Sequence, residues 1–402
     1  MKCLGLWSVA MAVVFAAGAA RAADLSLADA IATGKPILEE RLRFEAVDQA
    51  GFAREAQALT LRTHLGWETG AWNGLTGAVE FEDVARLGPE HYNTTLNGKT
   101  GYPTVADPDV AELNRLQIAW TPSKAFSATV GRQRINLDDQ RFIGSVNWRQ
   151  DDQTFDAVRL DGGLGAVRAT YAYLGKVNRT VGQSADWTSD SHALTGAWTV
   201  SPALKAEGFL YALDFKPVPA LSTETAGVRL AGQAPFKPVK IAYAAAYATQ
   251  TDYGRNPGRY RLPYWMGEVS GAWGAWTAKL NYESLGGDGK RGFSTPLATL
   301  HVFQGWADAF TTTPARGIDD LNLSLAVAPP VKLKHLSNLQ LFARHHDFAY
   351  QAGGGSLGTE WDGSVQASLT ARLTALVKIA DYRGVAGSPS RRKVWLQFDF
   401  NL

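Results

Sequence analysis

The chain has 402 residues, of which 46% are hydrophobic, and its 40 basic side chains nearly balance its 38 acidic ones. This balance argues against a nucleic-acid partner, which would require a basic patch or stripe. The single cysteine is Cys3, so we expect neither disulfide bonds nor thiolate metal sites.

The first residues have the pattern of a secretory signal peptide. Lys2 precedes an apolar run, and Ala20-Arg21-Ala22 has the small-x-small spacing of a signal peptidase site. We therefore expect a signal peptide over residues 1–22 and a mature chain over residues 23–402. Loss of Lys2 and Arg21 leaves 38 basic residues against 38 acidic ones, so this mature chain is formally neutral. An uncleaved anchor helix is the alternative for this apolar run.

The rest of the chain favours β-strands in one continuous domain. No later segment reaches the length of apolar sequence that a membrane-spanning helix needs, and no Pro-rich, Ser-rich or highly charged linker divides the chain. Runs of about ten residues instead alternate apolar and polar side chains. In one of them Leu321, Leu323 and Leu325 alternate with Asn322 and Ser324. Such a strand has one apolar and one polar face.

Counting these runs predicts about eighteen strands. They are expected near residues 37–47, 58–69, 75–84, 111–120, 125–135, 153–161, 165–175, 191–200, 203–215, 223–233, 238–249, 264–273, 275–284, 317–327, 336–349, 359–370, 373–383 and 391–402. Short turns alternate with long connections, the longest at 85–110, 136–152, 250–263 and 285–316. We therefore predict an all-β fold, a single transmembrane antiparallel β-barrel with short periplasmic turns and long extracellular loops.

The end of the chain and the aromatic residues favour the outer membrane of a Gram-negative bacterium. Residues 391–402 form an amphipathic last strand of the kind that the barrel assembly machinery recognises, so we expect that machinery, membrane lipid and lipopolysaccharide as partners. Aromatic residues near the predicted strand ends suggest interfacial girdles, for example Trp67, Trp120, Trp198, Tyr264 and Trp265.

If the apolar faces contact lipid, the alternate faces line the lumen. Basic residues on these faces include Arg43, Arg62, Arg115 and Arg344, and acidic residues are about as numerous. Unpaired charges cannot form a dry core, and eighteen strands enclose a space too wide for their own side chains to fill. We therefore expect an aqueous channel.

Residues 131–160 form a predicted hairpin with a charged tip. It contains Arg132, Arg134, Arg141 and Arg149, whose rigid guanidinium forks suit carboxylate or phosphate groups. The alternative is a solvated loop with internal salt bridges. Strand alternation would point Arg132 and Arg134 outward, toward lipid. Either they lie at the rim of the barrel or, as we prefer, a bulge at Gly131 turns them inward.

This segment resembles the hallmark segment of the bacterial alginate export family of outer-membrane β-barrels. The resemblance rests on Gly131-Arg132-Gln133, Arg141-Phe142-Ile143-Gly144, Trp148-Arg149-Gln150 and Thr154-Phe155-Asp156-Ala157-Val158-Arg159. It implies an eighteen-stranded channel with an electropositive constriction for an anionic polysaccharide. The turn at Thr370–Leu373 departs from the alginate exporter, which has a long periplasmic turn there.

Carried over residue by residue, the resemblance assigns the basic positions of the motif to Arg132, Arg134, Arg141 and Arg149. It assigns polar or packing roles to Gln133, Asn147, Trp148 and Asp156. With Arg159 and the inward-facing Arg43, Arg62, Arg115 and Arg344, these are the candidate pore-lining residues.

The predicted function is an outer-membrane channel that passes an alginate-like anionic polysaccharide or small anionic solutes through an arginine-lined pore. A general diffusion porin with weak selectivity is the main alternative. An outer-membrane enzyme is a weaker one, because the histidines show no spacing typical of a Ser-His pair or a metal site. We expect no catalytic residues, cofactor or metal.

Overall fold

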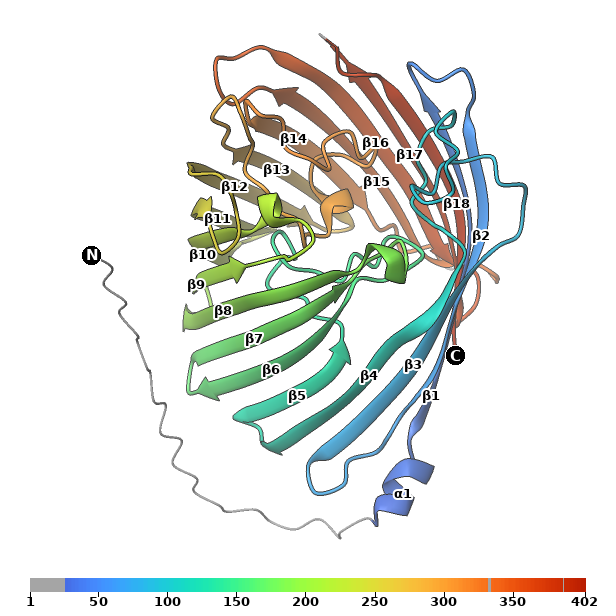
Figure 1. Cartoon of the computed structure of the whole chain (residues 1–402), viewed down its shortest axis with the longest axis vertical. Helices are drawn as coiled ribbons and strands as arrows, with labels where there is room; N and C mark the ends of the chain where they lie inside the picture. Colours follow the sequence, from blue (N-terminus) through green and yellow to red (C-terminus); the bar gives the residue numbers. More distant parts are fainter. Residues whose placement is uncertain (1–25, 332–333, 386) are drawn as a thin grey trace.

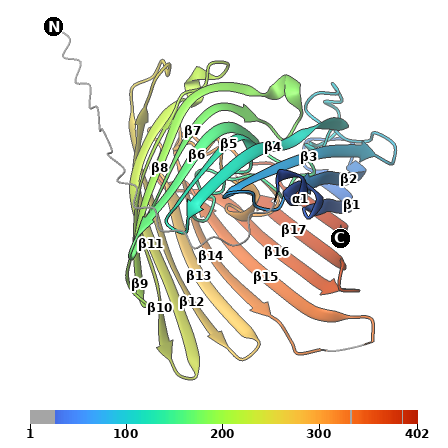
Figure 2. The ribbon, with the colours of Figure 1, turned by 90° about the horizontal axis from the view of Figure 1, so that it is seen from below.

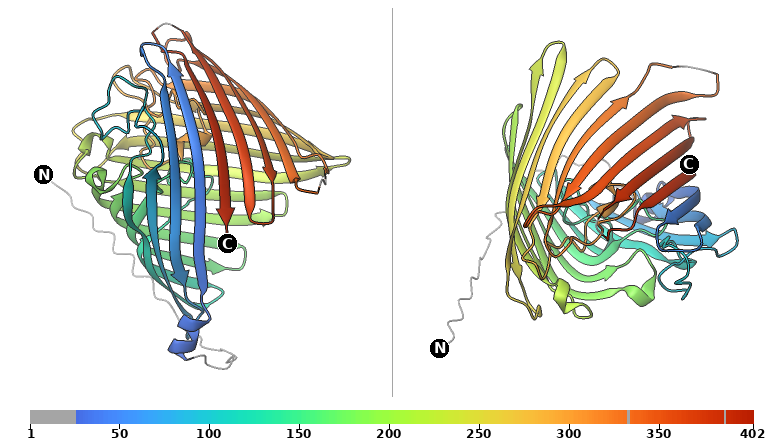
Figure 3. Two further views of the ribbon diagram at one scale, coloured as in Figure 1. Left: turned by 90° about the vertical axis from the view of Figure 1, so that its right-hand side faces the viewer. Right: turned by 90° about the horizontal axis from the view of Figure 1, so that it is seen from above.

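The computed structural model describes residues 26–331, 334–385 and 387–402, so the expected signal peptide lies outside the described residues. Eighteen antiparallel strands form a single sheet, in which β1 pairs with both β2 and β18. The sheet is therefore a closed barrel (Figure 1), with the first strands beside the last (Figure 3). The predicted all-β barrel of about eighteen strands is confirmed.

The strands match the predicted runs, with ends that differ by a few residues. Their bounds are β1 Lys35–Gln49, β2 Ala56–Glu68, β3 Leu75–Arg86, β4 Val110–Ser123, β5 Phe126–Gln133, β6 Thr154–Leu164, β7 Val167–Asn178, β8 Trp187–Ser201, β9 Leu204–Leu213, β10 Thr223–Phe236, β11 Val239–Asp252, β12 Arg261–Trp273, β13 Trp276–Leu285, β14 Ile318–Val327, β15 Ser337–Ala349, β16 Ser356–Ser368, β17 Leu373–Gly384 and β18 Arg391–Asn401. The helices are α1 Leu27–Ala32 and the 3-10 turns η1 Gln183–Ala185, η2 Pro219–Leu221 and η3 Leu300–Val302.

Helix α1 lies beside β1 at the end of the barrel that carries the short turns (Figure 2). Ser26 and Asp29 form a capping box that begins the helix, and the indole nitrogen of Trp67 on β2 donates to the carbonyl of Ile31 at 2.9 Å. None of the helices in the described part of the chain is long and apolar enough to cross a membrane.

Side-chain alternation along each strand separates a lipid-facing surface from the barrel interior. On β14, Leu321, Leu323 and Leu325 are exposed, whereas Asn322 and Ser324 are buried. Exposed leucines on the outer face are expected of a strand whose outer side contacts lipid.

One predicted girdle residue is placed differently. Trp265 is exposed, but the neighbouring Tyr264 is 2% exposed, and its hydroxyl donates to Glu283 at 2.7 Å. The expectation that Tyr264 belongs to an interfacial girdle is therefore wrong, because adjacent strand residues point to opposite faces of the sheet.

Two long connections fold into the barrel. We call them the β5–β6 segment (residues 134–153) and the β13–β14 segment (residues 286–317); both lie inside the ring of strands in Figure 1. They meet at a parallel bridge between Ile143 and Leu297, both fully buried. Part of the interior is therefore a dry apolar core, because the two segments supply the side chains that the barrel wall alone could not provide.

The register around Gly131 is regular. Val130 pairs with Val158 on the outer face, and Gln133 pairs with Phe155 on the buried face. Gly131 has a φ of +116°, and a β-carbon at this position would lie 2.2 Å from the carbonyl oxygen of Leu116. Glycine is therefore needed for a close backbone approach and not for an inserted residue.

The regular alternation leaves Arg132 on the outer side. It pairs with Asp156 on β6 and lies opposite Leu116 on β4, which is exposed, and paired residues of antiparallel strands share a face. The expected inward reorientation is therefore wrong for Arg132, whereas Arg134, which follows β5, does reach the buried Glu80 on the inner face. The Nε of Arg132 donates to Asp156 at 2.7 Å, so the charge is compensated at the end of the strand.

We predict that Gly131→Ala lowers the free energy of unfolding by about 1–3 kcal/mol, because alanine would be strained at this φ and would clash with the β4 backbone. Urea unfolding of the refolded barrel in detergent measures this. Gly162→Ala is the matched control, since a β-carbon there meets no atom within 4 Å. Equal losses in the two variants would contradict the prediction.

Candidate functional site

The β5–β6 segment is anchored to the barrel wall and to the β13–β14 segment through Arg141. This side chain is 1% exposed, and its Nε donates to Glu283 on β13 at 2.6 Å. Its other nitrogens donate to Thr295 at 3.2 Å and Gln304 at 3.1 Å. Arg141 is thus a buried anchor, and each of its three guanidinium nitrogens donates to the protein itself.

A second contact between the two segments surrounds Lys378 of β17. Its ammonium lies 3.8 Å from the ring centre of Trp148 and 3.6 Å from that of Trp306. The same nitrogen lies 2.6 Å from Nε2 of His301, which stacks on Trp148 with ring centres 4.4 Å apart. The cation is therefore held between one tryptophan from each segment.

The surroundings of His301 keep its imidazole neutral. Burial, reinforced by the charge of Lys378, lowers the pKa of His301 to about 3. The neutral ring accepts from Lys378 through Nε2, and Nδ1 is left to donate to Asp308 at 2.8 Å. Burial opposes the charge of Asp308, but Lys393 and His301 hold the pKa of that carboxyl well below its usual range.

A cavity of about 410 Å³ opens beside this cluster. Its lining includes Trp148 and His301 and carries four basic side chains against one carboxylate, that of Asp308. The basic side chains are Arg149, Arg179, Arg391 and Lys393.

Two of the four basic side chains form no ion pair in the part of the chain that the structure describes. Within the described ranges, neither Arg179 nor Arg391 lies within ion-pair distance of a carboxylate, whereas Arg149 pairs with Glu45 at 3.3 Å and with Asp308 at 3.2 Å. Arg179 lies 3.9 Å over the ring of Trp187, and Arg391 donates to backbone carbonyls of the β13–β14 segment. The cavity is therefore an electropositive site with an aromatic wall.

The predicted pore-lining residues fall into separate groups. Trp148 and Arg149 line the cavity. Arg43 and Arg344 lie against the tryptophans that surround Lys378. Arg43 is fully buried, donates to Gln397 at 2.7 Å and lies 4.2 Å over Trp148. Arg344 donates to Asp362 at 2.9 Å and to the carbonyl of Val302 at 3.2 Å.

A second group joins the β5–β6 segment to β2 and β3. Arg134 donates to Asp152 and to Glu80, both at 2.6 Å. Arg115 donates through Nε to the other oxygen of Glu80 at 3.1 Å, and Arg62 lies 3.6 Å from Asp152. The charges in this group compensate one another.

The remaining candidates lie away from both groups. Gln133 is buried and donates to the carbonyl of Ala157 at 3.2 Å, and Asn147 has an exposed side chain. Arg132 and Asp156 pair with each other on the outer side, and Arg159 pairs with Asp161 at 2.8 Å.

Sequence reasoning did not single out Arg179, Arg391, His301 and Asp308 as residues of the site. Arg179 follows β7, and His301 and Asp308 lie in the β13–β14 segment, where no strand alternation indicates direction. Arg391 begins β18, at the edge of the alternating run. The only signal available in the sequence was that two of the predicted long connections, 136–152 and 285–316, contain Trp148, His301 and Trp306.

We predict that Arg141→Met lowers the free energy of unfolding by about 3–5 kcal/mol, because it leaves the buried carboxylate of Glu283 without its cation. Chemical denaturation measures this, and the double variant with Glu283→Met should lose less than the single one. Arg259→Met is the control, since Arg259 is 92% exposed and its ion pair is worth less than about 1 kcal/mol. A loss as small as that of the control would refute the anchoring role.

We also predict that His301 makes the fold less stable in mild acid. Its pKa is about 3 in the folded protein against 6.5 when unfolded, so between these values the unfolded chain binds the proton more readily. Stability therefore falls as the pH drops below 6.5, by up to about 1.4 kcal/mol per pH unit from this group.

Unfolding free energies of wild type and His301→Gln, measured from neutral pH to mild acid, test this. Asp138 acts in the opposite sense, because burial and the neighbouring Asp139 raise its pKa to about 6. The variant retains Asp138, so only the difference between the two profiles reports on His301. Identical profiles would contradict the assignment.

Comparison with known proteins agrees with this architecture. OpdK of Pseudomonas aeruginosa, solved with vanillate, aligns with a TM-score of 0.71 at 15% identity, over 92% of this chain and 99% of its own. OccAB2 of Acinetobacter baumannii aligns with a TM-score of 0.71 at 14% identity, over 93% and 99%. OpdO of P. aeruginosa gives 0.72 at 15% identity, over 93% and 98%. At these identities the likeness shows the fold alone.

The sequence comparison supplies the family. No protein with a curated description matches the chain. The sequence model of the alginate export family matches residues 38–283, which is more than half of the chain and includes the whole β5–β6 segment. This confirms the resemblance seen in residues 131–160, and with the eighteen-stranded barrel it shows that the chain is an outer-membrane β-barrel of the alginate export family.

Proposed function

We propose that this barrel is a channel for small carboxylated solutes, such as acidic sugars, and that it selects them in the cavity where the β5–β6 and β13–β14 segments meet. The observation that carries this proposal is the lining of the cavity, which has four basic side chains and one carboxylate. The family and the fold indicate a transport protein and not an enzyme.

The chemistry of the lining suits such a solute. Guanidiniums bind carboxylates with two parallel hydrogen bonds, and Arg179 and Arg391 have no carboxylate of the described chain as an ion-pair partner. The stacked rings of Trp148 and His301 add apolar surface to the lining, which suits the apolar part of a sugar. Basic groups at a constriction attract anions and repel cations.

The size of the cavity favours a small solute. A volume of about 410 Å³ is in the usual range for small-molecule sites, and the stacked rings of Trp148 and His301 are part of its lining. An alginate-like polysaccharide is the second candidate, and the family match favours it. Passage of an extended polymer would require the two inner segments to separate.

We predict that the wild-type channel is anion-selective and that the Arg179→Gln, Arg391→Gln double variant loses most of this preference. Removing one unit charge close to a permeating ion changes its energy by about 1 kcal/mol in water, so we expect the anion-to-cation permeability ratio to fall about fivefold or more. Reversal potentials of single channels in planar bilayers under a salt gradient measure the ratio.

Arg259→Gln is the matched control, because Arg259 is exposed and pairs with Asp252 away from the cavity. Added monomeric and oligomeric uronates distinguish the candidates. A decrease of the channel current on addition of monomeric uronate supports the small-solute channel. A decrease with long oligomers alone supports the polysaccharide. A weakly selective current that the double variant leaves unchanged would indicate a general diffusion porin.

A further inference from the structure

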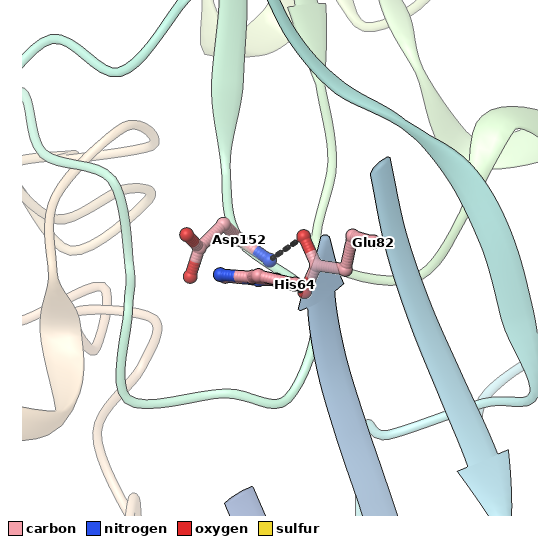
Figure 4. Close-up of side chains that lie close together, drawn as sticks. All are labelled: His64, Glu82 and Asp152. Carbon is pink, nitrogen blue, oxygen red and sulfur yellow. Dashed lines mark hydrogen bonds and ion pairs between the residues drawn. The ribbon is translucent and has the colours of Figure 1, made fainter. Parts of the chain in front are cut away.

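Three buried side chains from different parts of the chain converge beside the anchored β5–β6 segment. They are His64 on β2, Glu82 on β3 and Asp152 in the β5–β6 segment, and each is at most 2% exposed. One nitrogen or oxygen atom from each lies within 4.8 Å of the other two (Figure 4). This cluster is separate from the cavity proposed for transport.

The converging atoms lack hydrogen-bond partners. Nε2 of His64, Oε1 of Glu82 and Oδ1 of Asp152 are all buried without one in the part of the chain that the structure describes. Nε2 lies 3.2 Å from Oε1, which is an attractive contact only if a proton or another cation lies between them. Buried polar atoms without hydrogen-bond partners are costly, so one such atom on each of three adjoining side chains favours the binding of a cation here.

The other polar atoms of the same side chains are already engaged. Nδ1 of His64 lies 3.2 Å from a guanidinium nitrogen of Arg134 and 3.4 Å from Glu39. The second oxygen of Glu82 accepts from the backbone nitrogen of Asp152 at 3.4 Å. The second oxygen of Asp152 accepts from Arg134 at 2.6 Å. This is the outer-shell arrangement that orients metal ligands, with a carboxylate behind the imidazole.

We propose that His64, Glu82 and Asp152 form a binding site for a divalent transition-metal ion, and that the bound ion fastens the β5–β6 segment to the barrel wall. One imidazole nitrogen and two carboxylate oxygens match the ligand preferences of Zn²⁺, with a position left for water. The ion would join a segment that enters the lumen to two strands of the barrel wall, β2 and β3.

The surrounding charges permit a cation. Four carboxylates lie in or against the cluster, those of Glu39, Glu80, Glu82 and Asp152, against the three guanidiniums of Arg62, Arg115 and Arg134. With a neutral imidazole the net charge is therefore negative. Arg134 remains on the other oxygen of Asp152, and Arg62 lies 3.6 Å from Oδ1, the oxygen offered to the metal. Arg62 also lies 3.9 Å from Glu39, which can retain it when a metal binds.

Calorimetric titration of the refolded, tag-free barrel with Zn²⁺ after treatment with a chelator tests the site. We expect one ion per chain and an affinity at least tenfold weaker in Asp152→Asn and in His64→Ala. A Co²⁺ titration should give the strong visible absorption of a four-coordinate site in wild type only. His192→Ala is the control, since His192 is an exposed histidine on the outer side of β8, and it should bind as wild type does.

Protection of the β5–β6 segment from proteolysis, with and without Zn²⁺, tests the fastening role. We expect Zn²⁺ to slow cleavage within residues 134–153 in wild type and not in Asp152→Asn. Absence of stoichiometric binding, or equal binding by all variants, would overturn the site and favour a protonated His64 as the missing cation. Stoichiometric binding without protection would overturn the fastening role. Neither result bears on ion selectivity, so the transport proposal is tested independently.

Discussion

Closure of the sheet is the constraint on which the rest of the molecule depends. In the hydrocarbon of a membrane each backbone N–H and C=O must find a partner within the protein, and a sheet satisfies this only if it has no edge. Here β1 pairs with β18 over eleven residue pairs, from Glu39 with Asn401 to Gln49 with Arg391. The same pairing places Arg43 beside Gln397 and so builds one side of the central cluster.

A closed barrel of this size leaves an interior that its wall cannot fill, and the β5–β6 and β13–β14 segments fill part of it. They carry arginines into a region of low dielectric, where a charge is tolerated only if it is paired. Most of these guanidiniums therefore bind carboxylates of the protein itself, as Arg141 does with Glu283 and Arg134 with Asp152. In the transport proposal, the cations available to a solute are the few that form no ion pair with a carboxylate of the described chain.

Arginines that form ion pairs and arginines that form none thus have different roles in the same lumen. The paired arginines position the inner segments, and the tryptophans around Lys378 hold the two segments against the wall. Arg179 and Arg391 lie at the cavity that remains between them. A weakly charged lumen with a small electropositive site follows from this division, and it agrees with a sequence in which acids and bases are balanced.

The sequence by itself determined the strands, their number and the direction of their side chains, because the alternation of period two is local and the membrane imposes it on every strand. The resemblance in residues 131–160 identified the family for the same reason, since a short motif needs no tertiary information. The expected inward turn of Arg132 was wrong because Gly131 serves a close backbone approach, which only the register reveals.

The tertiary structure alone decided the site. Loop residues such as Arg179, His301 and Asp308 follow no periodic pattern, so their direction depends on how the inner segments pack. Which arginine is neutralised depends on partners far away in sequence: Arg141 and Glu283 are separated by 142 positions. The convergence of His64, Glu82 and Asp152 likewise exists only once the β5–β6 segment has folded against the barrel wall, because long-range contacts leave no spacing in the sequence.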